Sequence, residues 1–214
     1  MTIQGVIFDS DGTLVDSERM AAGLLRELLA EREIHLPFDE VLRRFRGVQF
    51  AIFVAELCQE HDHLDAEPFM RDFRGRSLEL FAAGLDAMPG ALDFIRELHL
   101  PKCVASNGPR TKIETCLKTA GLWDAFDGNI VSAYEVNAWK PSPELIVAAA
   151  RVLDLAPAQC LLVDDSIPGV QAGLAAGTQV AGYGDTDFSR FEGHPAFHRV
   201  PDYAALKTLL AALG

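Results

Sequence analysis

Two aspartates near the amino terminus could act together in catalysis or in metal binding. Asp9 and Asp11 follow the short apolar run 5–8, which is typical of a strand buried in a parallel sheet. Gly12 allows the chain to turn directly after them, so both carboxylates can converge on one small ligand. A single aspartate after a strand is more often a turn residue or a helix cap, so the meaning of this pair depends on its companions.

Further polar side chains follow later strand-like runs or lie in a nearby loop. They are Ser106, Asn107, Asp164 and Asp165 at strand ends and Lys140 in the loop before Pro141. Ligands of open parallel sheets bind beyond the carboxyl ends of the strands, so these groups are expected to meet at one edge. Taken alone, a serine here is usually a helix cap and a lysine is usually a solvated charge, but the complete set indicates a catalytic site.

The acidic members of this set predict a metal. Asp9, Asp11, Asp164 and Asp165 would repel one another and take up protons if they met without a cation. A ligand set made only of oxygen atoms favours magnesium over zinc. We therefore expect Mg²⁺ as the cofactor.

The same residues predict phosphoryl transfer through a covalent intermediate. Asp9 would attack phosphorus and form an aspartyl-phosphate, while Asp11 would protonate the leaving oxygen and later deprotonate water. Lys140 would neutralise the phosphate. Ser106 and Asn107 would hold its non-bridging oxygens.

The elements that position these residues indicate an α/β protein. Strands are expected at 5–8, 102–105, 129–132, 160–163 and 179–181, alternating with helices after residue 88. This alternation predicts a Rossmann-like parallel sheet in a three-layer α/β/α core. Residues 15–87 have no period-two pattern but several helical ones, so we expect a core of 1–14 and 88–214 with an inserted α-helical cap of 15–87.

The composition excludes several classes of partner. The 214-residue chain has a formal net charge of -12, which disfavours nucleic acid and anionic membranes. It has no apolar run approaching the roughly 20 residues of a membrane span, and no signal peptide precedes Asp9, so we expect a cytoplasmic protein. The four cysteines are far apart and are expected to be reduced, mostly buried side chains.

These motifs resemble the haloacid dehalogenase superfamily, in its β-phosphoglucomutase-like branch with a helical cap. The resemblance rests on D-x-D-G-T-L-V-D at 9–16, on Ser106, on Lys140-Pro141 and on Asp164-Asp165. It implies that Asp9 and the backbone carbonyl of Asp11 bind magnesium with the acidic pair at 164–165, and it leaves open which of that pair touches the metal. It also implies a phosphatase for a small phosphorylated sugar or a sugar acid such as 6-phosphogluconate.

Two alternatives share the fold. A phosphosugar mutase of the β-phosphoglucomutase type uses the same aspartate pair but returns the phosphoryl group to the substrate. A non-catalytic binding protein should lack an essential acid, and none is missing here. Asp11 and the absence of lysine between residues 15 and 87 argue against dehalogenase and phosphonate hydrolase chemistry.

The cap offers one candidate for substrate selection. The resemblance implies that the loop 46–48 faces the substrate, so Arg46 and Gly47 are expected to contribute to its binding. A sugar-acid carboxylate would need a cation opposite it, and Arg46 could supply one. His61 and His63 could suggest a second metal site, but their acidic neighbours and loop position favour a solvated turn.

Overall fold

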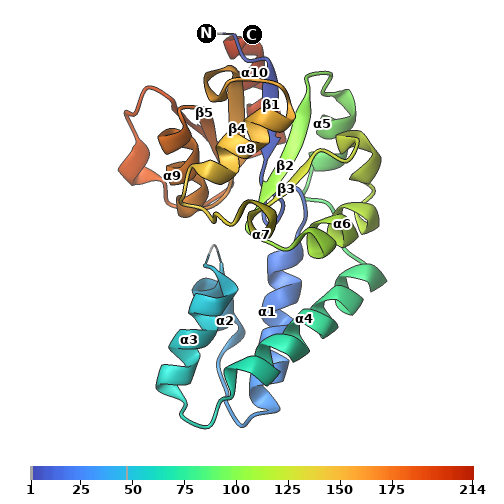
Figure 1. Cartoon of the computed structure of the whole chain (residues 1–214), viewed down its shortest axis with the longest axis vertical. Coiled ribbons are helices and arrows are strands. Elements are labelled where there is room, and N and C mark those ends of the chain that lie inside the picture. Colours follow the sequence, from blue (N-terminus) through green and yellow to red (C-terminus); the bar gives the residue numbers. More distant parts are fainter. Residues whose placement is uncertain (1, 47) are drawn as a thin grey trace.

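The computed structural model describes residues 2–46 and 48–214, and it contains a parallel sheet with helices on both faces (Figure 1). Within these residues, neighbouring strands pair in parallel in the order β3-β2-β1-β4-β5-β6. The strands are β1 (Gly5–Phe8), β2 (Lys102–Ser106), β3 (Ile130–Ser132), β4 (Cys160–Asp164), β5 (Gln179–Tyr183) and β6 (Phe197–Val200). The predicted Rossmann-like core is confirmed.

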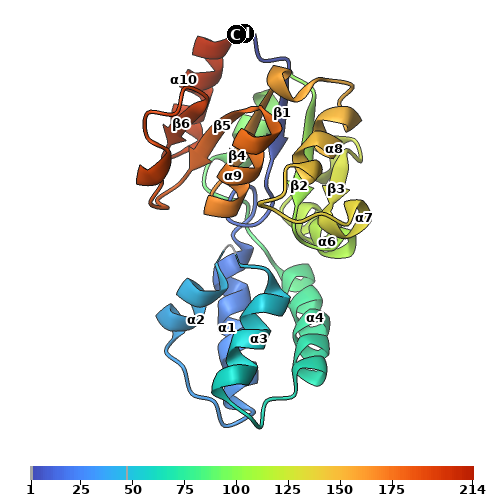
Figure 2. The ribbon, with the colours of Figure 1, turned by 60° about the vertical axis from the view of Figure 1, so that its left-hand side comes forward.

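Side chains of β1 alternate between two apolar layers. Val6 and Phe8 join one buried cluster, whereas Ile7 joins another on the opposite face, as the period of two residues in a strand requires. The first cluster is covered by helices α5 (Ala91–Glu97), α6 (Arg110–Thr119) and α10 (Tyr203–Leu213), and the second by α8 (Glu144–Val152) and α9 (Ile167–Ala176). Figures 1 and 2 together show these helices around the sheet. Because helices pack on both faces of the sheet, the carboxyl ends of the strands are held in fixed positions relative to one another.

The sequence did not reveal strand β6 or the short helix α7 (Ala133–Val136). β6 lies at the edge of the sheet, and of its four residues only Val200 is buried. A half-exposed edge strand lacks the continuous apolar run by which the other strands were predicted. Helix α7 follows the carboxyl end of β3 directly, and its Tyr134 lines the cavity described below.

Four helices form the cap beyond the carboxyl ends of the strands (Figures 1 and 2). They are α1 (Ser17–Ala30), α2 (Phe38–Phe45), α3 (Phe50–Glu60) and α4 (Ala66–Ala83). Phe53, Phe69 and Phe81 are fully buried and stabilise this group. No helix in the described part of the chain combines the length and the apolar character that crossing a membrane would need.

The chain passes twice between the sheet and the cap, and the two passages pair. Val15 forms an antiparallel bridge with Ala87. The Asp16 N–H donates to the Asp86 carbonyl at 3.1 Å, and the Met88 N–H donates to the Leu14 carbonyl at 2.9 Å. The domain boundaries expected at 14/15 and 87/88 run through this pairing and stay a prediction.

The cysteines form no disulfide among the described residues. Cys103, Cys116 and Cys160 are buried, Cys58 is half-buried, and all four are free. Burial raises the pKa of the Cys160 thiol to about 11. The side chains of Cys103 and Cys160 serve as small core groups between the sheet and its helices.

Candidate active site

A buried lysine joins the ends of two neighbouring strands. Asp9 follows β1, and Asp164 is the last residue of β4. Lys140 Nζ lies 2.5 Å from Asp9 Oδ1 and 2.7 Å from Asp164 Oδ2, and its side chain is only 3% exposed. Parallel pairing of β1 with β4 therefore brings two of the predicted acids to one ammonium group.

The two adjacent aspartates after β4 have different surroundings. Asp164 is fully buried, and its second oxygen, Oδ1, accepts hydrogen bonds from the Ser166 N–H at 2.9 Å and from Ser166 Oγ at 2.7 Å. Asp165 lines the cavity between core and cap and accepts a hydrogen bond from Thr13 Oγ1 at 3.1 Å. The sequence left open which carboxylate faces a ligand, and the geometry favours Asp165.

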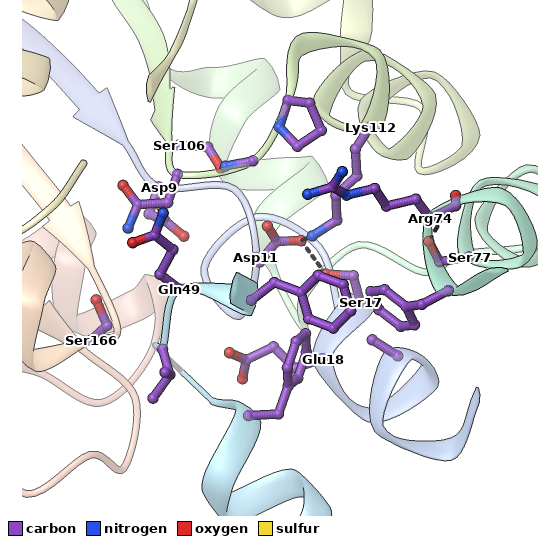
Figure 3. Close-up of a pocket in the computed structure, with 18 of the residues that line it drawn as sticks. Asp9, Asp11, Ser17, Glu18, Gln49, Arg74, Ser77, Ser106, Lys112 and Ser166 are labelled. Atoms are coloured by element: carbon purple, nitrogen blue, oxygen red, sulfur yellow. Dashed lines mark hydrogen bonds and ion pairs between the residues drawn. The ribbon is translucent and has the colours of Figure 1, made fainter. Parts of the chain in front are cut away.

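Asp11 is held by a lysine and a serine. Its Oδ1 accepts hydrogen bonds from Lys112 Nζ at 2.8 Å and from Ser17 Oγ (Figure 3). Burial alone would raise the pKa of Asp11, but the charge of Lys112 and both hydrogen bonds bring this pKa below its usual value. Asp11 is thus a carboxylate with a cation beside it.

Ser106 and Asn107, at the end of β2, have different uses. Ser106 Oγ accepts a hydrogen bond from the Gly108 N–H at 3.0 Å, which leaves the hydroxyl hydrogen for another acceptor. Asn107 Oδ1 accepts from the Lys140 N–H at 2.8 Å, and its amide nitrogen donates to the Lys140 carbonyl at 3.5 Å. The Asn107 side chain thus positions the loop that carries Lys140, and because Asn107 also lines the cavity, its expected contact with phosphate stays a prediction.

Arg46 is paired with protein carboxylates. Its Nε donates to Glu18 Oε2 at 2.7 Å, and its guanidinium lies 3.6 Å from Asp185 in the loop after β5. Arg46 is not among the residues that line the cavity, so its expected contact with substrate is not favoured by this geometry. Gly47, expected to bind substrate, lies outside the described residues.

A cavity of about 380 Å³ separates the core from the cap. Its core wall contains Asp9, Asp11, Ser106, Lys112, Lys140 and Asp165. Its cap wall includes Ser17, Glu18, Phe45, Gln49, Phe50, Phe73 and Arg74. In Figure 3 the Gln49 amide points from the cap toward Asp9, so a ligand on Asp9 would meet both walls.

The core wall carries an excess of buried negative charge. Burial raises the pKa of Asp9 to about 7; Lys140 opposes this rise, while Asp164 and Asp11 add to it. Burial, followed by the charges of Glu18, Asp9 and Asp164, raises the pKa of Asp165 well above its usual value. A cation bound between Asp9 and Asp165 would relieve this repulsion.

The donors at this position suit a hard divalent cation. Among residues 2–46 and 48–214, no three acidic, imidazole or thiol side chains converge as a ready metal cluster. Asp9 and Asp165 nevertheless supply two carboxylates that line the cavity. The backbone carbonyl of Asp11 is a third oxygen donor, and it precedes the turn that Gly12 makes with a φ of 79°. This set of oxygens fits Mg²⁺.

His61 and His63 lie in the turn after α3, where His63 Nε2 hydrogen-bonds to the Arg32 carbonyl.

Several lining residues were not predicted from the sequence. Lys112 had a usable signal, since it stands in the first turn of the helix that follows β2, near the carboxyl edge of the sheet. Ser17 had a weaker sequence signal, namely its position at the start of α1. Gln49, Phe50 and Arg74 had none, because their approach to the core depends on how the cap is oriented.

Comparison with known proteins identifies the family. A sequence profile of the haloacid dehalogenase-like hydrolases matches residues 3–177. 6-Phosphogluconate phosphatase of Escherichia coli K12 is 34% identical over 182 residues, which cover 83% of this chain and 81% of that protein. A family hydrolase structure from Deinococcus radiodurans, with bound phosphate and sodium, is 31% identical, has a TM-score of 0.80, and is matched over 99% of this chain and 96% of that one.

A structure from Thermotoga maritima described as a candidate β-phosphoglucomutase shows the same fold. Its TM-score is 0.77 at 24% identity, with 99% of this chain and 100% of that chain covered. The expected resemblance to the haloacid dehalogenase superfamily and the expected fold are therefore confirmed. The chain belongs to the haloacid dehalogenase-like hydrolases and is a phosphatase of that family.

Proposed function

We propose that this phosphatase uses Mg²⁺ and Asp9 to hydrolyse a small phosphorylated sugar or sugar acid. The observation that carries the proposal is the Asp9 carboxylate, which faces the cavity with Lys140 on one of its oxygens and Asp11 close by in the chain. The similarity to 6-phosphogluconate phosphatase supports the substrate class. A cytoplasmic location, and the absence of nucleic acid and membrane partners, stay predictions from the sequence.

Asp9 would act as the nucleophile. Lys140 holds Asp9 Oδ1, which orients the carboxylate and leaves its other oxygen to attack phosphorus as the bond to the leaving oxygen breaks. Lys140 also places positive charge next to the developing aspartyl-phosphate. The Ser106 hydroxyl, already accepting from the Gly108 N–H, can donate its hydrogen to a non-bridging phosphoryl oxygen.

Asp11 would move the protons. The phosphate dianion raises the pKa of a neighbouring carboxyl, so Asp11 can arrive at the first step protonated and give that proton to the leaving oxygen. It then accepts a proton from the water whose oxygen attacks phosphorus and breaks the bond to Asp9. The contact with Lys112 stabilises the carboxylate form that the second step requires.

Asp9, Asp165 and the backbone carbonyl of Asp11 would hold Mg²⁺. When bound, the ion supplies positive charge that offsets the phosphate and the two carboxylates. Asp164 has a different task, because both of its oxygens are used by Lys140 and Ser166. Removal of the Asp164 carboxylate should therefore first displace the Lys140 side chain, and only then affect the binding of Mg²⁺.

The proposal is tested by phosphate release from a panel of phosphorylated metabolites, with Mg²⁺ and with a chelator. Sugar and sugar-acid phosphates should be hydrolysed only with Mg²⁺, and the Asp9→Asn variant should release no phosphate. A mutase would instead convert β-glucose 1-phosphate into its isomer, given the bisphosphate activator, without releasing free phosphate. That result would replace the phosphatase proposal.

A further inference from the structure

The cap wall of the cavity includes a cluster of phenylalanine rings. The ring centroids of Phe50 and Phe73 are 4.4 Å apart, and those of Phe45 and Phe73 are 6.0 Å apart. All three rings line the cavity, and Phe45 and Phe50 remain half-buried. Such a wall lowers the local dielectric, so a charge placed against it interacts strongly with any partner.

Arg74, on α4, brings a positive charge to this wall. Figure 3 shows its side chain extending from α4 across the cavity toward Lys112 and Ser106 of the core. Its neighbour Ser77, one turn later in the helix, also lines the cavity. The side chain therefore lies where the leaving-group part of a substrate bound at Asp9 would extend.

The other cations at the interface of core and cap already have acidic partners. Lys140 is paired with Asp9 and Asp164, and Lys112 is paired with Asp11. Arg46 is paired with Glu18. Arg74, by contrast, makes no ion pair with the residues that the structure describes.

We propose that Arg74 selects substrates whose leaving group carries an anionic end, with a carboxylate as the fitting chemistry. This inference rests on the proposed function and names its substrate class more narrowly. An acidic sugar phosphate entering this cavity would face Asp11, Glu18 and Asp165, so its second negative charge needs a cation away from them. The Arg74 guanidinium meets that need, and the phenylalanine rings strengthen the contact by excluding water.

A solvated surface charge is the simpler role for an exposed arginine, and the same helix contains such a residue. Arg71 is also exposed on α4 but does not line the cavity. It therefore serves as a matched control, with the same side chain in the same helix, away from the substrate. Arg46 is the competing candidate, because the sequence pointed to it for the same task.

The test uses two substrates that differ only at the carbon farthest from the phosphate. 6-Phosphogluconate ends in a carboxylate and glucitol 6-phosphate in a neutral CH₂OH group. The kcat/KM for each is measured with Mg²⁺ for the wild-type protein and for Arg74→Met, Arg74→Lys, Arg71→Met and Arg46→Met. We expect Arg74→Met to lower kcat/KM for the acid by about 10- to 100-fold and for the alcohol by less than about threefold.

Arg74→Lys should recover part of the preference, and Arg71→Met should leave it unchanged. Equal losses for both substrates in Arg74→Met, or a loss of preference in Arg46→Met alone, would overturn the assignment of Arg74 and leave the proposed phosphatase intact. A wild-type protein that hydrolyses neither substrate would overturn the proposed substrate class together with this inference. Circular dichroism of each variant verifies that the fold is kept.

Discussion

The core wall and the cap wall of the cavity differ in how their charges are compensated. On the core wall Lys140 lies between two carboxylates and Lys112 lies against Asp11, so each ammonium has its partner within the protein. The cap wall has three phenylalanine rings and Arg74, which has no ion pair among the described residues. The core thus presets the phosphoryl chemistry, while the cap leaves a charge for the substrate to match.

The largest expected effect comes from the nucleophile on the core wall. Asp9→Asn keeps the shape of the side chain but removes the attacking carboxylate, so kcat should fall by about 10⁴-fold or more. Phosphate release under saturating substrate and Mg²⁺ measures this loss. Asp16→Asn is the matched control, because Asp16 is a nearby aspartate that does not line the cavity. Activity retained in Asp9→Asn would refute the assignment of the nucleophile.

The next effect concerns the cation that organises the core wall. Lys140→Met removes the ammonium between Asp9 and Asp164 and leaves two buried carboxylates without their partner. We expect kcat/KM to fall by about 100- to 1,000-fold, which is typical when a preorganised charge at the reacting group is lost. Lys118→Met on exposed helix surface controls for the loss of one positive charge. A decrease smaller than about threefold would show that the core wall does not depend on Lys140.

The core wall should also make the metal-free protein less stable as pH rises. Burial raises the pKa of Asp9 from 3.8 to about 7, so the folded state binds this proton more tightly than the unfolded state. Stability is therefore lost between about pH 4 and pH 7, where the unfolded carboxyl is already ionised. We expect the free energy of unfolding to fall by about 2 kcal/mol over this range, below the roughly 4 kcal/mol of an isolated group because Asp9 is coupled to its neighbours.

Urea unfolding in a chelator, repeated at several pH values, measures this loss. The Asp9→Asn variant should show a flatter profile and should be the more stable protein at pH 7. Added Mg²⁺ should restore stability to the wild type more than to the variant. An identical pH profile for the two metal-free proteins would contradict the repulsion inferred at the core wall.

The core wall was largely predictable from the sequence. Continuous apolar runs identified five strands, and parallel strands place their carboxyl ends at one edge, so Asp9, Ser106 and Asp165 could be grouped from the order of strands and polar residues alone. Period and spacing do not fix side-chain direction, however. The sequence could not show that the Asn107 amide turns to Lys140, nor that Asp164 is enclosed while Asp165 faces the cavity.

The cap wall was much less predictable. Helical periodicity revealed four cap helices, but it does not specify how they dock on the core. Arg46 and Arg74 both belong to arginine-rich segments of the cap. Packing of helices within the cap brings Arg46 to Glu18 of α1, whereas docking of the cap on the core decides that Arg74 lines the cavity. Edge strand β6 was missed for a related reason, since a half-exposed segment has no continuous apolar run.

A smaller effect is expected from the aromatic surface of the cap wall. Phe50→Leu keeps an apolar side chain but removes a ring that lies 4.4 Å from that of Phe73. We expect KM to rise by about two- to fivefold with kcat unchanged, because the ring lines the cap wall and would contact the substrate there rather than at the reacting phosphoryl group. Phe38→Leu, a half-buried cap position outside the cavity, is the control. A fall in kcat with unchanged KM would show that the cap wall takes part in the chemistry.

The smallest effect is expected for Arg46, and its size distinguishes the role of Arg46 from that of Arg74. Arg46→Ala should change kcat/KM for acidic and neutral substrates alike, by less than about threefold, because its guanidinium is neutralised by Glu18. Stability should fall by about 1 kcal/mol, since Glu18 is left nearly buried without its partner, whereas the exposed Asp185 contributes little. Urea unfolding of Arg46→Ala, of Glu18→Gln and of the double variant Glu18→Gln/Arg46→Ala measures this coupling, and the double variant should be more stable than Arg46→Ala. A selective loss for acidic substrates in Arg46→Ala would return the recognition of the substrate charge from Arg74 to Arg46.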